Sequence, residues 1–409
     1  MKDNNFLKKR MITIINKSDC CGCWGCENIC PRKCISMIED NEGFRYPVVD
    51  VENCIDCGLC EKVCPIKIQI CDNFIPKSYV VQNKDGFVLR NSTSGGFYSA
   101  ISKYVIEQGG VVFGAAFDEN MVLKHTYSET YDICSKYQGS KYVQSLIGDS
   151  YKQAKKFLEA GRLVVFSGTP CQIAGLYGFL MNRRYENLIT VDLVCRGTPS
   201  PFVLKKYLEY YASEVGSPVV DYRSRDKYYG YNYSTATITF ADKSCKYHKG
   251  KESDFMLGLY FNNLISRPSC YDCHFKTLHR LSDITIFDCW NAPAVSQSFT
   301  SNGATNVFIH TQRGSGIFEK LKDNFIWSVS DIKSIIMKDG IMIRNNVPEN
   351  HRRAEFFKDL NILSIKDLEK KYLPKSFILR ICYYLKPFFY KIGIFSLYFK
   401  LKKRIKNLI

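Results

Sequence analysis

The chain has 409 residues, 45% hydrophobic and 24% charged, a balance that excludes a disordered or fibrous protein and predicts a globular one of two or three domains. Its formal net charge of +17 raises the question of an anionic partner. The 19 cysteines and an N-terminus without a signal-peptide pattern predict a cytoplasmic protein whose thiols serve as ligands rather than in disulfides.

Eight N-terminal cysteines form two copies of one spacing, C-x2-C-x2-C-x3-C followed by proline. The runs are Cys20, Cys23, Cys26 and Cys30, and then Cys54, Cys57, Cys60 and Cys64. This is the ferredoxin-type spacing for two 4Fe-4S clusters, in which the fourth cysteine of each run crosses to the other cluster. One cluster is therefore expected on Cys20, Cys23, Cys26 and Cys64, and the other on Cys54, Cys57, Cys60 and Cys30. Structural zinc, the alternative, usually separates two C-x2-C pairs by a longer loop.

Residues 42–50, between the two runs, fit the hairpin that joins the halves of such a domain, and residues 66–77 read as a connector. Beyond the connector, apolar strands alternate with helical stretches. Strands are expected at 111–117, 163–166 and 188–194, and helices at 97–107, 148–160, 201–214 and from just after Cys171 to about residue 180. This alternation predicts an α/β domain with a largely parallel sheet, and residues 219–240 predict a smaller β portion.

Ser94, Gly95 and Gly96 precede the first of these helices. Such residues allow close backbone approach and offer N–H donors to a phosphate or pyrophosphate. They are also ordinary residues at the start of a helix, so the tripeptide alone leaves both interpretations open.

Four further cysteines stand outside the two runs in a suggestive arrangement. Cys171 and Cys195 follow two of the predicted strands, and Cys270 and Cys273 form a C-x2-C pair. Two loops and one pair could converge on a third cluster, although free cysteines are also common buried residues. Cys21 adjoins a predicted ligand and could substitute for it.

The C-terminal residues 371–409 contain ten Lys or Arg residues and no acidic residue, interleaved with aromatic and aliphatic side chains. Lys386, Pro387 and Lys391 interrupt the apolar run, which argues against a spanning helix. The segment predicts either peripheral contact with an anionic membrane surface or a helix packed on the protein with a solvated basic face. Nucleic acid is the least favoured partner, and none is predicted.

Six short motifs then occur in one order along the chain. They are residues 94–97 (SGGF), 140–145 (SKYVQS), 168–172 (GTPCQ), 194–197 (VCRG), 269–273 (SCYDC) and 282–285 (SDIT). Together they resemble the beta subunit family of coenzyme F-420 hydrogenases and dehydrogenases over roughly residues 79–330. Arg196 and residues 287–291 (FDCWN) depart from the family pattern, where many members have histidine and a glycine-rich sequence.

The resemblance implies a flavin, FAD or another, contacted by Ser94, Gly95 and Gly96, with Lys141 as a phosphate or ring partner. It also implies that Cys171, Cys195, Cys270 and Cys273 hold a third 4Fe-4S cluster. Relatives with this layout and a basic tail look like those that accompany bacterial surface-polysaccharide synthesis.

The expected fold class is α/β (α+β overall). Residues 1–76 form a ferredoxin-like dicluster domain, 77–330 a larger α/β flavin-type domain, and 331–409 a helical region with the basic amphipathic tail. The expected function is an iron–sulfur flavoprotein oxidoreductase that passes electrons between a hydride donor or small substrate, a flavin and the clusters. Its partner is a ferredoxin-like or other redox protein, and no catalytic residue is assigned. The rivals are a flavin-free electron-transfer subunit and a membrane-surface scaffold that serves a partner enzyme.

Overall fold

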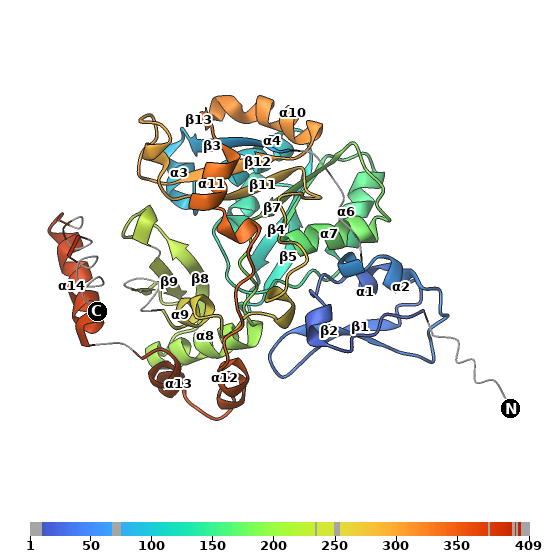
Figure 1. The fold of residues 1–409 in the computed structure, drawn as a ribbon, viewed down its shortest axis with the longest axis horizontal. Coiled ribbons are helices and arrows are strands. Elements are labelled where there is room, and N and C mark those ends of the chain that lie inside the picture. The colour runs from blue at the N-terminus through green and yellow to red at the C-terminus, as the bar shows by residue number, and fades with distance from the viewer. Residues whose placement is uncertain are drawn as a thin grey trace.

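The structure is a computed structural model that describes residues 10–67, 75–233, 235–248, 254–374, 377–394, 397, 400 and 401. Figure 1 shows an N-terminal lobe, a central sheet covered by helices, and a smaller three-stranded sheet beside them. The mixed α/β class that the sequence predicts is confirmed.

Two short helices and a hairpin build the N-terminal lobe. Helices α1 (Gly25–Ile29) and α2 (Leu59–Lys62) each carry one cysteine of a run, and β1 (Ile35–Glu39) pairs antiparallel with β2 (Arg45–Val49). The predicted hairpin is thus confirmed. Part of the predicted connector, residues 68–74, lies outside the described residues.

An eight-stranded sheet forms the centre of the molecule, in the order β13-β3-β12-β11-β7-β6-β4-β5. The strands are β3 (Lys77–Asn83), β4 (Val111–Phe117), β5 (Leu123–Ser128), β6 (Val164–Gly168), β7 (Leu188–Leu193), β11 (Ile284–Cys289), β12 (Ala304–Ile309) and β13 (Phe325–Val329). The four strands β11, β7, β6 and β4 run parallel to one another. All other pairs in this sheet are antiparallel. The prediction of a largely parallel sheet is therefore wrong outside these four strands. The flanking strands pair antiparallel. Two of them, β12 and β5, come directly after their partners β11 and β4 along the chain.

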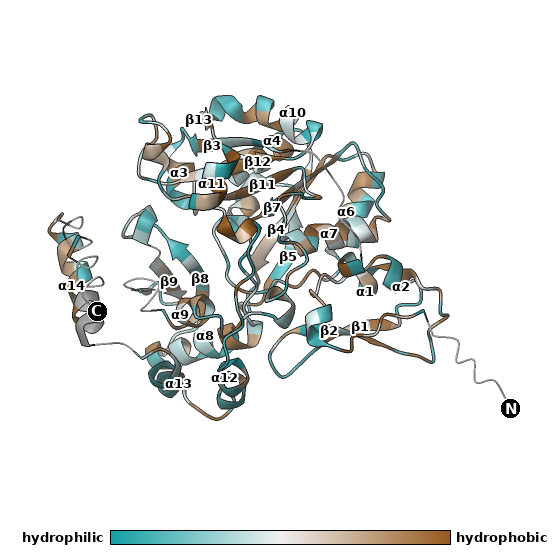
Figure 2. Ribbon diagram, viewed as in Figure 1, coloured by the Kyte–Doolittle hydropathy of each residue, from teal (hydrophilic) through white to brown (hydrophobic). Residues whose placement is uncertain are grey.

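Helices cover both faces of this sheet, because neighbouring residues of a strand point to opposite faces. Val112 and Val165 pack in one core with α4 (Phe97–Glu107) and α10 (Gln312–Leu321). Their neighbours, among them Phe113 and Phe166, pack in another core with α6 (Ser150–Glu159) and α7 (Pro170–Phe179). Figure 2 shows the hydrophobic strands between these layers. The shorter helices of this part are α3 (Gly86–Asn91), α5 (Tyr131–Cys134) and α11 (Ile332–Lys338).

The smaller sheet has the order β10-β9-β8 and confirms the predicted β portion. Its strands are β8 (Val219–Asp226), β9 (Thr235–Phe240) and β10 (Cys245–Tyr247). One core joins this sheet to α8 (Pro201–Val215), α9 (Phe255–Phe261), α12 (Arg353–Asp359) and α13 (Ile365–Tyr372). Phe44 and Tyr46 of the N-terminal lobe belong to the same core, so the lobe is packed against the rest of the protein.

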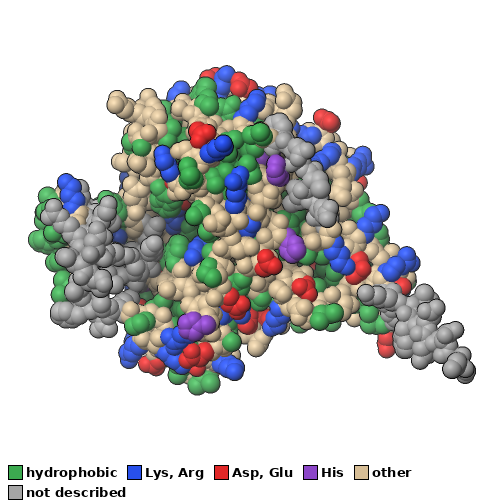
Figure 3. Space-filling view, viewed as in Figure 1, with side chains coloured by type: hydrophobic (Ala, Val, Ile, Leu, Met, Phe, Trp, Pro, Cys, Tyr) green, Lys and Arg blue, Asp and Glu red, His purple; other side chains and the backbone are tan. Residues whose placement is uncertain are grey.

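Helix α14 (Phe377–Lys391) lies beyond the smaller sheet. The Tyr390 ring is 5.0 Å from that of Tyr229, and the Lys386 ammonium is 4.4 Å from the Tyr229 ring centre. No helix in the described part of the chain is long and apolar enough to cross a membrane. The face in Figure 3 shows Lys and Arg side chains dispersed among Asp and Glu rather than gathered in one patch.

Candidate functional site

Three thiols of the N-terminal lobe gather around that of Cys26. Burial raises the pKa of the Cys26 thiol well above its usual range, and three neighbouring thiols raise it further. These neighbours are Cys20, Cys23 and Cys64. The structure thus brings together one of the two predicted ligand sets, including the crossed fourth cysteine of the second run.

The other predicted set surrounds a small cavity at the outer end of the lobe. Its lining includes Cys30, Cys54, Cys57 and Cys60. Cys34 lines it too, with its Sγ atom 3.4 Å from that of Cys30. Sequence reasoning gave Cys34 no role, and no spacing pattern marks it. Cys57 is exposed to solvent, so this cavity reaches the surface.

The four later cysteines also converge, on a cavity between α7 and the loop after β7. Cys171, Cys195, Cys270 and Cys273 all line this cavity. Burial raises the pKa of the Cys195 thiol, and the thiols of the other three cysteines raise it further. The N–H of Thr198 donates to the Cys270 sulfur at 3.4 Å.

A fifth thiol, that of Cys21, lies at the same cavity but comes from the N-terminal lobe. It is buried, and the neighbouring thiols of Cys171 and Cys23 raise its pKa well above the usual range. The Cys21 thiol is in turn the main reason why the pKa of Cys171 is lowered to about 7. Cys21 therefore connects the thiol set around Cys26 with the set in the α/β part.

The donor chemistry of these three sets fits iron–sulfur clusters. Thiolates are the usual ligands of 4Fe-4S cubanes, four to a cluster. Among the described residues, no three His, Cys, Asp or Glu side chains gather closely enough to hold a single metal ion. In two of the three sets the thiols line a cavity, an arrangement that suits a cubane better than a tetrahedral zinc ion.

A second kind of cavity, of about 300 Å³, lies at the edge of the sheet where β6, β7 and β11 end. Ligands of α/β proteins commonly bind at this edge. The lining combines aromatic and apolar side chains such as Tyr98, Tyr137 and Leu123 with polar groups. Residues 195–198 line both this cavity and the four-cysteine cavity, so only one loop separates the two.

The predicted tripeptide contributes two of its three residues to this cavity. Ser94 and Gly96 line it, and Gly96 has the left-handed conformation (φ 80°) that glycine favours. Gly95 instead packs against the sheet, where an added Cβ would meet the Val81 carbonyl oxygen at 2.4 Å. Its N–H donates to Thr305 Oγ1 at 2.8 Å. The amide of Gly95 is therefore engaged with the protein itself.

Lys141 lines this cavity and also a wider one of about 1210 Å³. Its Nζ donates to the carbonyl oxygens of Lys136 and Gln138, each at 2.7 Å. Burial lowers the pKa of Lys141 to about 7, so its charge changes within the physiological range. The lysine is thus placed where a ligand that spans both cavities would meet a titratable cation.

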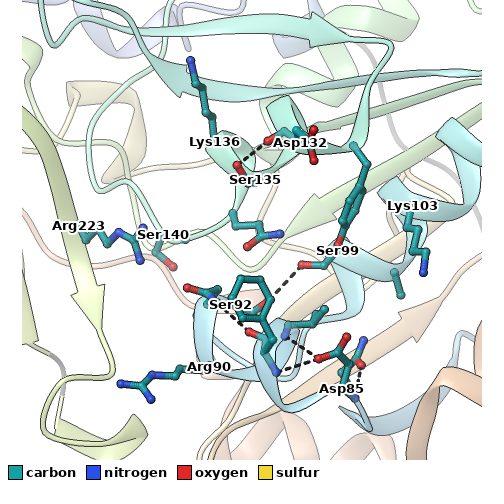
Figure 4. A pocket seen from close by; sticks show the side chains of 18 of the residues that line it. Asp85, Arg90, Ser92, Ser99, Lys103, Asp132, Ser135, Lys136, Ser140 and Arg223 are labelled. Atoms are coloured by element: carbon teal, nitrogen blue, oxygen red, sulfur yellow. Dashed lines mark hydrogen bonds between the residues drawn. The ribbon is translucent and has the colours of Figure 1, made fainter.

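The wider cavity is polar and lined by charges of both signs (Figure 4). Its cations include Arg90, Lys103, Lys136 and Arg223, which are labelled in Figure 4, and also Lys227. Burial lowers the pKa of Lys227 to about 8. These cations suit the anionic part of a ligand, such as a phosphate group.

A network that sequence reasoning missed closes the wall beside Ser94. The carboxylate of Asp288 accepts from the Ser94 hydroxyl at 2.7 Å and from the Tyr231 hydroxyl at 3.1 Å, and it is ion-paired with Arg225. The Arg225 guanidinium lies 4.4 Å from the centre of the Trp290 ring. In the sequence, the sign of this network was the departure from the family pattern at residues 287–291, which include both Asp288 and Trp290.

His125 is a second missed residue, and it joins two of the quoted motifs. Its Nδ1 accepts from the Ser145 hydroxyl at 2.9 Å, and its Nε2–H donates to the Ser167 carbonyl at 3.0 Å. The Gln172 amide donates in turn to Ser145 Oγ. Burial lowers the pKa of His125 to about 4, so the imidazole is neutral. Ser145 and Gln172 were visible in the motifs, but His125, which bonds to Ser145, was not.

Arg196, the other departure from the family pattern, lies on the loop shared by the two cavities. It donates to Asn263 Oδ1 at 2.8 Å, and its guanidinium is 5.4 Å from the ring centres of Tyr260 and Phe261. These contacts hold the loop against α9. The arginine therefore holds the loop between the two cavities in place by packing on aromatic rings as well as by hydrogen bonding.

The cysteine sets define an iron–sulfur protein, and the comparisons identify its relatives. Residues 19–68 match the 4Fe-4S dicluster domain, which confirms an iron–sulfur electron-transfer module in the N-terminal lobe. Residues 161–334 match the family defined by the C terminus of the coenzyme F420 hydrogenase/dehydrogenase beta subunit. The predicted resemblance is thus confirmed, although the motifs at residues 94–97 and 140–145 lie outside the matched range.

Among solved structures, a chain of the F420-reducing NiFe hydrogenase complex from Methanosarcina barkeri is similar to this one. The two are 18% identical, the match covers 78% of this chain and 96% of that chain, and the TM-score is 0.43. No curated protein matches the chain.

Proposed function

We infer that the protein is an iron–sulfur flavoprotein oxidoreductase that passes electrons between a hydride donor or small substrate and a chain of 4Fe-4S clusters. One observation carries the proposal: residues 195–198 form a wall common to the 300 Å³ cavity and the four-cysteine cavity. A redox cofactor in the first cavity would lie next to a cluster in the second.

Three clusters belong to this proposal, each with four cysteine ligands. The ligands are Cys171, Cys195, Cys270 and Cys273 for the third cluster, Cys20, Cys23, Cys26 and Cys64 for the first, and Cys30, Cys54, Cys57 and Cys60 for the outer one. Cys21, whose thiol neighbours those of Cys23 and Cys171, supports an order in which the third cluster adjoins the first cluster and the first adjoins the outer one. The exposed Cys57 then marks the end at which a ferredoxin-like partner exchanges electrons.

The 300 Å³ cavity is the proposed flavin site, and its volume lies within the usual range for small-ligand sites. A bound flavin supplies the exchange between hydride donors, which deliver two electrons, and clusters, which take one. Ser94 and Gly96 form one side of the site, and Lys141 provides a cation for phosphate at the passage to the wider cavity. The basic side chains of that cavity favour a phosphorylated or otherwise anionic substrate. Surface-polysaccharide synthesis, which the resemblance implies, is the proposed setting.

A Cys171→Ala variant tests this route, with Cys134→Ala as the matched control. Cys134 is a buried cysteine of the same α/β part that lines none of the cysteine cavities; it packs beside α4 and donates to the Thr130 carbonyl. The flavin is reduced photochemically, and reduction of the N-terminal clusters is followed by absorbance and electron paramagnetic resonance. We expect the Cys171 variant alone to lose transfer to these clusters. Transfer at the wild-type rate in that variant would show that the route is wrong.

The C-terminal tail supports a second, separate proposal, namely peripheral contact with an anionic membrane. Apolar side chains of the tail remain exposed, including Leu385 (42%), Phe388 (57%) and Ile392 (49%), while Lys386 is turned towards Tyr229. An exposed apolar row in a basic segment suits an anionic lipid surface. Flotation with phosphatidylserine liposomes is expected for the full chain and not after deletion of residues 377–409. Equal flotation of both, or of neither, contradicts this contact.

A further inference from the structure

Arg267 is buried at the junction between the N-terminal lobe and the rest of the protein. It lies three residues before Cys270, and only 1% of its surface is exposed. It is among the largest fully buried side chains of the described residues. Burying a guanidinium is costly unless hydrogen bonds and a negative charge compensate it.

The hydrogen bonds of Arg267 tie three segments together, but every acceptor is neutral. Its Nε donates to the Cys20 carbonyl at 2.7 Å and its Nη2 to the Arg45 carbonyl at 3.0 Å. Its Nη1 donates to Gln144 Oε1 at 3.1 Å. The guanidinium also lies 4.2 Å from the centre of the Tyr46 ring. These contacts give each of its three nitrogens one acceptor and fix its position, but they do not neutralise its charge.

Within the described residues, Arg267 forms no ion pair with a carboxylate. Other buried arginines do, as Arg353 pairs with Glu42 and Arg225 with Asp288. The ionisable groups that face Arg267 are thiols on both sides, together with the Tyr46 phenol. These thiols are Cys20 and Cys21 from the first run and Cys270 from the four-cysteine cavity. Cysteines on both sides of the junction are thus the available counter-charges.

The first cysteine run is also shaped to receive this guanidinium. Gly22 has the left-handed conformation (φ 68°), and an added Cβ would lie 2.8 Å from Arg267 Nη1 and 2.7 Å from Gln144 Nε2. No side chain larger than hydrogen fits there without moving the arginine. The close approach of the cysteine loop to Arg267 is therefore built into the sequence at Gly22.

We propose that Arg267 is a positioning residue and the shared counter-ion of the first and third clusters, and that it raises the reduction potentials of both. This inference rests on the ligand assignments of the proposed function. Reduction adds negative charge to a cluster, and a fixed buried cation stabilises the reduced form more strongly than a solvated one. Arg267 lies beside only two of the three sets. The outer cluster, on Cys30, Cys54, Cys57 and Cys60, serves as an internal reference.

The test is a redox titration of the holoprotein followed by electron paramagnetic resonance, with Arg267→Met compared with the wild type. At a fixed ambient potential, we expect the ratio of reduced to oxidised form of the first and third clusters to fall at least about tenfold in Arg267→Met. That corresponds to about 59 mV for a one-electron couple. The potential of the outer cluster stays unchanged. In Arg267→Lys, which keeps the charge, the potentials of the first and third clusters stay close to those of the wild type. If the methionine variant does not fold, Arg267→Gln takes its place in the same titration.

The matched control is Arg353→Met, which removes another buried cation that bonds to the N-terminal lobe, but one paired with Glu42. Its three potentials should equal those of the wild type. No shift in an Arg267 variant with a full iron content, or an equal shift of all three potentials, overturns the inference. A wild-type protein that lacks the iron of a third cluster instead refutes the proposed function. The two failures are therefore distinguishable by the iron content.

Discussion

The charge of Lys141 predicts a pH dependence of flavin binding. Burial lowers the pKa of this lysine to about 7 from the ordinary value of 10.5. It is therefore about nine-tenths protonated at pH 6 and about one-tenth at pH 8. If its ammonium binds the pyrophosphate of FAD, the apparent affinity falls about tenfold over this interval, or ~1.4 kcal/mol. Binding is thus favoured below the folded-state pKa and lost as the pH rises through it.

The assay is titration of the flavin-free protein with FAD and with riboflavin at several pH values, followed by flavin fluorescence. Riboflavin has no phosphate, so its affinity should not change with pH. Lys141→Arg should bind FAD tightly and without pH dependence, because arginine stays charged. This variant also separates Lys141 from Lys227, whose pKa burial lowers to about 8. An FAD affinity that is constant from pH 6 to 8, or the same dependence in Lys141→Met, would refute the reasoning.

Two further predictions concern the junction between the lobe and the α/β part. Gly178→Ala should destabilise the protein by roughly 1–3 kcal/mol, since the new Cβ would lie 2.2 Å from the Val63 carbonyl oxygen; thermal unfolding measures this. Arg353→Met should cost about 3–5 kcal/mol in denaturant unfolding, because it leaves the Glu42 carboxylate without its buried partner.

Each of these predictions has a matched control. Gly316→Ala changes another helical glycine that has nothing within 4 Å of the added Cβ, and it should stabilise the protein by ~1 kcal/mol. Equal effects of the two glycine substitutions would contradict the close packing at Gly178. For the ion pair, removing both charges with Glu42→Gln and Arg353→Met should cost less than removing Arg353 alone. A double variant that is less stable than the single one would show that the pair is not the cause.

Local sequence signals predicted the elements around the candidate site closely. The helix expected at residues 97–107 and the strand at 111–117 have these bounds in the structure, because Gly109 and Gly110 interrupt the chain between them. The cysteine spacing likewise predicted which thiols gather, since the crossing rule depends on order along the chain.

The features that the sequence did not predict depend on contacts between distant segments. β3 pairs with β12 and β13, more than 200 residues later, and no local pattern encodes that register. Asp288 meets Ser94 and Arg225 only when the two sheets come together. Gly95 followed a familiar phosphate-binding pattern, but its place over the Val81 carbonyl was visible only in the fold.

The proposed function requires that three thiol sets carry clusters beside a flavin cavity. The most direct measurement is anaerobic purification of the full chain, with iron, acid-labile sulfide and flavin quantified per polypeptide. We expect about twelve irons, about twelve sulfides and one flavin. About eight irons without flavin would contradict the proposed function, and would limit the protein to electron transfer through the N-terminal lobe.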